Sequence, residues 1–148
     1  MANIGKHNAP SSVVDLLTTE LNALTNNTAS AASSAIANQT NLDLRADIWL
    51  HLASLTPTGA PYINVYILEA IDGSTYPSAT GSVLRNQPQQ LLCSFNLDTS
   101  TAAQDVVVRD VPLPPASFKV VLDNQSGVTL GATLNTLKMI TYNQNLNG

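Results

Sequence analysis

The sequence predicts a single all-β domain of antiparallel strands, either a sandwich or a barrel. The stretch Val106–Leu122 joins two β-branched, apolar runs through a corner at Pro114 and Pro115, a pattern typical of a strand, a rigid bend and a second strand. In all, about seven or eight short apolar runs are separated by turn signals, as in sandwiches and barrels. Strands do not alternate with long helical patterns, so a parallel sheet is not expected.

The chain has 148 residues, enough for one domain that buries about 70% of its unfolded surface without a metal or a disulfide. Residues 1–12 are polar and contain Pro10, and we expect them to form an extended N-terminal arm. Residues 13–148 then form the single β domain. The one cysteine, Cys93, excludes an internal disulfide.

The segment 13–24 has an ambiguous pattern. Val13, Leu17, Leu21 and Leu24 have the spacing of a helical stripe. The residues that follow are rich in Thr, Asn and Ser and carry no charge, which is poor helix chemistry. We therefore favour an extended segment along a sheet edge, with room for one helical turn before it, although the spacing leaves both helix and strand open.

The clearest predicted strand is Leu42–Leu52. Its apolar side chains occupy alternate positions and predict a core-facing side: Leu42, Leu44, Ala46, Ile48, Leu50 and Leu52. The other side carries Asp43, Arg45, Asp47, Trp49 and His51, as on an antiparallel sheet with one face in water. Asp43 and Asp47 flank Arg45, which indicates a solvated charge cluster.

Further strands follow along the chain. Tyr62–Ile71 is apolar on both sides and predicts a central, covered strand, which the turn dipeptide Asp72-Gly73 ends. Residues 74–90 predict a long loop, of the kind that is usually functional or a contact element. In Leu91–Leu97, Cys93 occupies an inward position beside Phe95, so we expect a buried, inert thiol.

The C-terminal part continues this pattern. Val106–Leu122 supplies the next two strands, and the residues Asp123–Gly127 predict a tight reversal after them. Val128–Ala132 and Leu137–Tyr142 predict either a closing hairpin or one kinked long strand, and a polar tail ends the chain.

Composition and charge exclude several function classes. Charged residues make up 11% of the chain, and polarity comes instead from 15 Asn, 15 Thr and 13 Ser. A net charge of −4 and dispersed Lys and Arg argue against nucleic-acid binding, which needs a basic stripe. No signal peptide and no membrane-spanning apolar run are visible, so we expect a protein made in a cytoplasm, without a membrane partner.

No catalytic or metal motif stands out. The two histidines are His7, in the predicted arm, and His51, which shares a strand side with Asp47 and Trp49. No nucleophile-elbow pattern accompanies them, so a Ser-His-Asp site is not expected. One cysteine and two distant histidines do not form a structural zinc site, and no phosphate-binding glycine loop occurs. We predict no catalytic, metal or cofactor residues.

Trp49, the only tryptophan, lies on the polar side of its strand. Two interpretations remain open. Another segment of the chain covers the indole, as is common for such aromatics, or the indole is an anchor for a protein interface.

Taken together, the segments Asn41–Asp47, Val65–Tyr76, Leu113–Pro115 and Phe118–Gly127 resemble small virion structural proteins of tailed bacteriophages, including capsid decoration or cement proteins. The similarity spans residues 15–142 as an ordered pattern of strands and turns. It implies a jelly-roll-like β-sandwich that binds the outside of the head shell as a homodimer or homotrimer. Such a protein clamps neighbouring major capsid subunits, and the family pattern contains no catalytic residues.

Two alternatives belong to other function classes. The first is a carbohydrate- or receptor-binding module of a tail fibre, in which Trp49, Tyr62, Tyr66 and Tyr76 stack on sugar rings. The second and weaker one is a small hydrolase or lyase, since a fold does not exclude catalysis.

Overall fold

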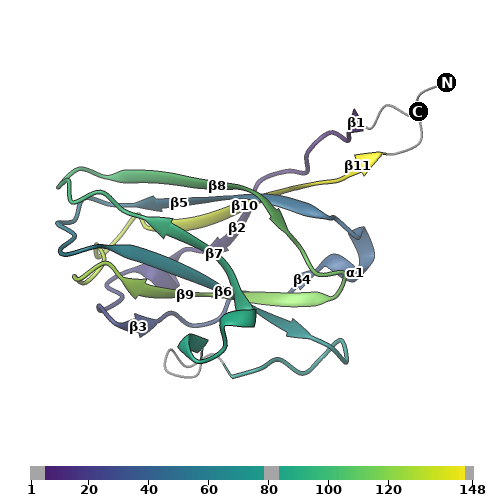
Figure 1. The fold of residues 1–148 in the computed structure, drawn as a ribbon, viewed down its shortest axis with the longest axis horizontal. Coiled ribbons are helices and arrows are strands. Elements are labelled where there is room, and N and C mark those ends of the chain that lie inside the picture. Colours follow the sequence, from purple (N-terminus) through teal and green to yellow (C-terminus); the bar gives the residue numbers. More distant parts are fainter. Residues whose placement is uncertain (1–5, 79–83, 146–148) are drawn as a thin grey trace.

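The computed structural model describes residues 6–78 and 84–145, and its ribbon is shown in Figure 1. Two antiparallel sheets face each other. The four-stranded sheet has the order β2-β10-β5-β8 and contains β2 (Val14–Leu17), β5 (Arg45–Leu52), β8 (Gln104–Pro112) and β10 (Thr136–Tyr142). The five-stranded sheet has the order β3-β9-β6-β7, with β4 also paired to β9. Its strands are β3 (Thr28–Ala29), β4 (Ile36–Ala37), β6 (Tyr62–Ala70), β7 (Leu91–Asn96) and β9 (Ser117–Gln125).

The strand order is that of a jelly roll. β3 and β4 both pair with β9 and act as two halves of one interrupted edge strand. We count β3 and β4 as one strand, leave out the separate pair β1 and β11, and renumber the eight remaining strands along the chain. Their orders in the two sheets are then 1-8-3-6 and 2-7-4-5. Both sheets therefore mix strands from the two halves of the chain, as in a sandwich of two Greek keys. The prediction of an all-β, jelly-roll-like antiparallel sandwich is confirmed.

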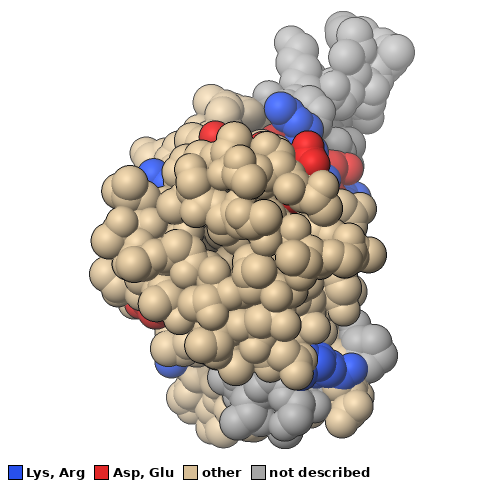
Figure 2. Space-filling view, turned by 90° about the vertical axis from the view of Figure 1, so that its left-hand side faces the viewer, with Lys and Arg blue, Asp and Glu red and all other residues tan. Residues whose placement is uncertain are grey.

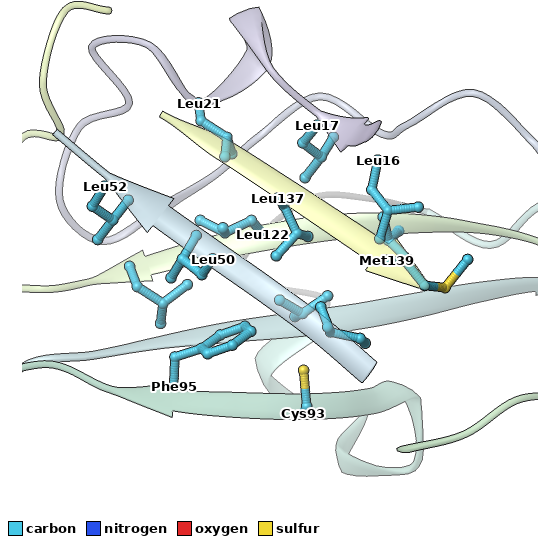
Figure 3. Packing of buried hydrophobic residues seen from close by; sticks show 14 of the residues in the cluster. Leu16, Leu17, Leu21, Leu50, Leu52, Cys93, Phe95, Leu122, Leu137 and Met139 are labelled. Carbon is cyan, nitrogen blue, oxygen red and sulfur yellow. The ribbon is translucent and has the colours of Figure 1, made fainter. Parts of the chain in front are cut away.

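The core lies between the two sheets. Alternate side chains of β5, Ala46, Ile48, Leu50 and Leu52, are fully buried, as the alternation predicted. Figure 3 shows Leu50 and Leu52 facing Phe95 and Leu122 of the opposite sheet. Cys93 belongs to the same cluster.

A proline corner moves the chain from one sheet to the other. β8 and β9 flank residues 113–116 and belong to different sheets. Proline fixes the backbone at such a bend and cannot extend a ladder. The bend predicted at Pro114 and Pro115 is thus a crossing between the two layers.

Between β3 and β4, the edge segment binds β9 through serine side chains as well as through backbone bonds. The amide nitrogen of Leu122 donates to the Ser30 hydroxyl (3.1 Å), and that of Val120 donates to the Ser33 hydroxyl (2.9 Å).

The extended edge segment expected within residues 13–24 is present as β2, at the edge of the four-stranded sheet. However, the one helical turn, Thr19–Leu21, follows β2 instead of preceding it.

Three sequence-based boundaries are wrong. Leu42 and Leu44 are exposed, because a helical turn, α1 (Asn38–Asn41), ends with Leu42 in a left-handed conformation (φ 51°) and β5 begins only at Arg45. β9 continues through Asp123 and Asn124, both fully buried, so the reversal begins at Ser126. Residues 128–132 lie in a loop and not in a strand.

The two ends of the described chain lie side by side. β1 (Lys6–His7) pairs with β11 (Gln144–Asn145), and this ribbon extends beyond the sandwich at the upper right of Figure 1. The amide of Ser11 donates to the carbonyl of Thr141 (2.8 Å), so the segment between β1 and β2 follows β10. None of the described helices has the length and apolar character needed to cross a membrane.

Candidate functional site

The outer face of the four-stranded sheet carries Trp49. On β5, Asp47, Trp49 and His51 point away from the core, opposite the buried alternate positions. The Trp49 side chain is 41% exposed. Its strand neighbours are Val107 on β8 and Lys138 on β10. Within the described chain, the indole therefore lies on the outer face and is partly exposed, with Lys138 Nζ 5.8 Å from its ring centre.

Hydrogen bonds fix the position of the indole. The Trp49 Nε1–H donates to Asp105 Oδ1 (2.9 Å), and His51 Nδ1 lies 2.8 Å from the same oxygen. The hydrogen bond to His51 is the main cause that holds the pKa of the Asp105 carboxyl below its usual range. Burial opposes it, and the hydrogen bond from Trp49 lowers the pKa by a smaller amount. An ionised Asp105 thus orients both side chains.

A shallow groove of about 160 Å³ adjoins the indole. Its floor is apolar, and two ion pairs stand at its rim: Lys138 Nζ lies 3.3 Å from Asp15 Oδ1, and Arg109 Nη1 lies 3.4 Å from Asp47 Oδ2. The lining residues are Val13, Asp47, Trp49, Val107, Arg109, Lys138, Met139 and Ile140. We call this surface the Trp49 groove.

A β-bulge shapes one wall of the Trp49 groove. Asp110 has a left-handed backbone (φ 58°), and its amide donates to Asp47 Oδ1 (2.9 Å) where the register between β5 and β8 shifts. Arg45 pairs with Asp110 (3.6 Å). The charge cluster expected from Asp43, Arg45 and Asp47 is therefore divided, because the bulge gives Arg45 a partner on β8.

The outer face of the five-stranded sheet is partly covered. Leu84 is fully buried against it, beside Tyr66 and Val121. Arg85 donates two hydrogen bonds to the buried Asp123 carboxylate, from Nε to Oδ2 (2.9 Å) and from Nη2 to Oδ1 (2.6 Å). The last part of the predicted 74–90 loop is thus packed onto the sheet, while residues 79–83 lie outside the described chain.

The aromatic side chains considered for sugar stacking do not assemble. Tyr62 and Tyr66 belong to β6 of the five-stranded sheet, on the opposite side of the sandwich from Trp49. Tyr66 is buried, and Tyr76 packs against the same outer cluster, with Lys119 Nζ 4.5 Å from its ring centre. Trp49 is therefore the one member of this set in the Trp49 groove.

The residues considered for chemistry are also dispersed. Burial raises the pKa of the Cys93 thiol to about 12, so the thiol is inert at neutral pH. The described side chains contain no group of three or more His, Cys, Asp and Glu arranged to hold a metal ion. His51 has the carboxylate of Asp105 as its partner, while His7 lies in β1.

A second surface was not predicted from the sequence. Four loops meet at the end of the sandwich on the left of Figure 1: residues 22–27, 53–61, 97–103 and 126–135, which we call the loop end. These loops contain a single charged residue, Asp98. Figure 2 views this end directly and shows a broad area without Lys, Arg, Asp or Glu. The loops that form the loop end are distant in sequence. The sequence alone shows that each loop has few charges, but it does not show that the loops meet.

Comparison with known proteins identifies no family for this chain. No protein-family model and no curated protein matches the chain. Among solved structures, the CBM36-1 domain of a multidomain xylanase from the hindgut metagenome of Trinervitermes trinervoides is 9% identical, with a TM-score of 0.45, covering 91% of this chain and 97% of that one. A chain of turnip yellow mosaic virus is 11% identical, with a TM-score of 0.38, covering 99% and 95%.

A cleaved adhesin domain of Lys-gingipain from Porphyromonas gingivalis is 9% identical, with a TM-score of 0.35, covering 77% of this chain and 61% of that one. These identities and TM-scores are low. The fold assignment therefore rests on the strand order itself.

Proposed function

We propose that this chain is a non-enzymatic structural protein of a phage virion, of the capsid decoration or cement type. It binds the outer surface of the head shell and stabilises contacts between major capsid subunits. The sequence resemblance gives the class of protein, and the observation that carries the docking role is the open Trp49 groove. Its place is the exterior of the capsid, after synthesis in the cytoplasm of the bacterial host.

The Trp49 groove has the anatomy of a protein interface. Protein hot spots are enriched in Trp and Arg, lie in a desolvated centre and are surrounded by a polar rim. Here the indole and Val107 supply apolar surface, while the Asp47–Arg109 and Asp15–Lys138 pairs stand at the edge. Charges at a rim fix orientation and exclude wrong partners more than they add affinity.

The anchor is also held in place before binding. The hydrogen bond to Asp105 fixes the indole on a strand of the sheet, so less side-chain freedom is lost on association. Many identical copies on one shell add avidity, so each contact needs only modest affinity.

Binding of the purified chain to heads assembled without it tests this proposal. Trp49→Ala is expected to weaken co-sedimentation with such heads by about tenfold or more, as loss of an interface hot spot does. The matched control is Tyr62→Ala, which removes a 39% exposed aromatic from the opposite sheet and should bind as the unaltered chain does. Equal binding of Trp49→Ala and the unaltered chain, or no binding of either, would contradict the proposal.

A second candidate is binding of a saccharide in the Trp49 groove, as in a receptor-binding module of a tail fibre. One exposed indole beside polar groups favours it, since small-molecule sites combine apolar walls with a few placed polar groups. A glycan array distinguishes the two functions. Binding of glycans that Trp49→Ala abolishes would support the second candidate, and an array without signal would remove it.

A further inference from the structure

We propose that the loop end is a surface through which two copies of this chain bind each other, with Leu134 as its anchor. The loop end is rigid, exposes an apolar residue and contains a single charged residue. The proposed self-association does not depend on binding to a shell.

Buried asparagine side chains tie the loops of this end together. The amide of Asn124, which is fully buried, donates to the carbonyls of Leu24 (3.0 Å) and Val128 (2.9 Å). The amide of Asn135, also buried, donates to the carbonyl of Gly131 (2.6 Å) and to Asn22 Oδ1 (3.2 Å). These bonds join residues 22–27 to 126–135, and a preformed surface loses little conformational freedom on binding.

A third loop is held just as closely. The backbone nitrogen of Ala53 donates to Asn135 Oδ1 (3.1 Å), and the amide of Thr58 donates to the carbonyl of Ser126 (3.1 Å). Gly127 has a φ of +82°, and a Cβ atom there would lie 2.3 Å from Thr58 Oγ1 and 2.8 Å from the Thr58 carbonyl oxygen. Only glycine fits at this contact, so residues 22–27, 53–61 and 126–135 form one packed body.

The loop end holds a leucine in an unfavourable conformation. Leu134 has a φ of 68° and is 74% exposed. Left-handed backbone is disfavoured for residues such as leucine and persists where the surroundings impose it. Here the neighbouring Asn135 fixes the chain. Leu134 is exposed and therefore adds almost nothing to the core, and it presents an apolar side chain on the charge-poor loop end, where a second molecule can cover it.

The charge distribution indicates a second copy as the partner. The chain has a net charge of −4, so identical copies repel each other when their charged faces meet. In a two-fold dimer the same patch meets itself, and any charge near the axis faces its own copy. The loop end keeps this repulsion small, because it contains one charged residue, Asp98. It also caps the long axis of the molecule, away from β1 and β11 (Figure 1), which leaves the Trp49 groove open.

Sedimentation velocity of the full chain over a range of concentrations tests the inference. The unaltered chain is expected to sediment with the mass of two chains at high concentration. Leu134→Asn and Leu134→Asp should raise the dissociation constant of the dimer by about tenfold or more, the loss expected for an interface anchor. Asn and Asp tolerate left-handed backbone better than leucine does, so both variants should remain folded, as a thermal melt will show.

The matched control is Ile71→Asp, at a 93% exposed position in the turn after β6, at the other end of the sandwich. It should associate as the unaltered chain does. A monomer at all concentrations, a stoichiometry other than two, or an unchanged dissociation constant in both Leu134 variants would overturn the inference. Equal weakening by Ile71→Asp would also overturn it. Loss of shell binding in Trp49→Ala is measured separately and leaves this result unaffected.

Discussion

At the level of single residues, Asp105 controls the orientation of Trp49. Its Oδ1 accepts the indole N–H and lies within hydrogen-bond distance of His51. The pKa of Asp105 is lowered, first by the hydrogen bond to His51 and then by the one from Trp49. A carboxyl with a lowered folded pKa contributes stability above its unfolded pKa, and this contribution is lost as the pH falls through the folded pKa.

The lowered pKa of Asp105 predicts how Trp49 responds to acid. The indole should keep its orientation from neutral pH down to about pH 4, the unfolded pKa of an aspartate, and should be released only below it. Trp49 is the only tryptophan, so fluorescence anisotropy reports on it alone. Asp105→Ala should show the released signal at neutral pH while its circular dichroism stays unchanged. A transition well above pH 5 in the unaltered chain would contradict this prediction.

Some residue-level features follow from the sequence and others do not. Alternation along Leu42–Leu52 placed Trp49 and His51 on the outer side correctly, because β5 obeys a strict period of two from Arg45 onward. It placed Leu42 and Leu44 wrongly, because the left-handed Leu42 ends the pattern. The left-handed, exposed position of Leu134 could not be predicted, since the neighbouring Asn135 bonds to distant loops.

At the level of elements, one ion pair attaches a loop segment to the five-stranded sheet. Asp123 is fully buried and accepts two hydrogen bonds from Arg85, while Gln125 Nε2 donates a third (3.1 Å). Leu84 packs beside this pair. Burying a carboxylate is tolerated only where such partners satisfy it, so the position of the segment and the course of β9 depend on each other.

Removing Arg85 should therefore be costly. Arg85→Met leaves the buried carboxylate largely unpaired and should lower the free energy of unfolding by about 3 kcal/mol. The matched control, Arg109→Met, removes the exposed partner of Asp47 and should cost less than about 1 kcal/mol. Urea denaturation measures both values.

The double variant Arg85→Met with Asp123→Leu separates the ion pair from packing. It should recover much of the loss, because replacing both members of a buried pair with apolar groups is often nearly neutral. A cost of Arg85→Met no larger than that of Arg109→Met would contradict the role given to Arg85.

The same pair explains why β9 was cut short in the sequence-based prediction. The residues Asp123-Asn124-Gln125 have the composition of a turn, yet they form the buried end of a strand. Arg85 and the loop carbonyls of Leu24 and Val128 satisfy their polar groups. Arg85 and Leu24 are distant in sequence, so the local pattern does not reveal them. In contrast, β6 and β7 were predicted well: β-branched and aromatic residues dominate β6, and in β7 the inward Cys93 and Phe95 alternate with the polar Ser94 and Asn96.

At the level of the whole molecule, the jelly roll separates surfaces with different chemistry. The outer face of the four-stranded sheet combines the exposed Trp49 with paired charges of both signs. The loop end is nearly without charge (Figure 2). A charged rim suits a different partner with a complementary pattern, whereas a neutral end suits a copy of the same chain. The two contacts that we propose would allow an assembled unit to bind a larger shell.

The class of fold could be derived from the sequence, but the arrangement of these surfaces could not. Turn signals and short apolar runs give a sandwich or barrel, and the proline corner gives a bend near Pro114. The loop end exists only because β2, β5, β7 and β9 all end on the same side of the sandwich, which is a property of strand order. No local pattern encodes that order.

The central claim is that this chain is part of the outer head shell of a phage. A cryo-electron microscopy reconstruction of the phage whose genome encodes this chain tests the claim most directly. The account predicts jelly-roll density on the outside of the head, with the Trp49 groove facing the major capsid subunits, and loss of that density from particles without the gene. A head surface without this density, or the chain located in the tail, would contradict the claim.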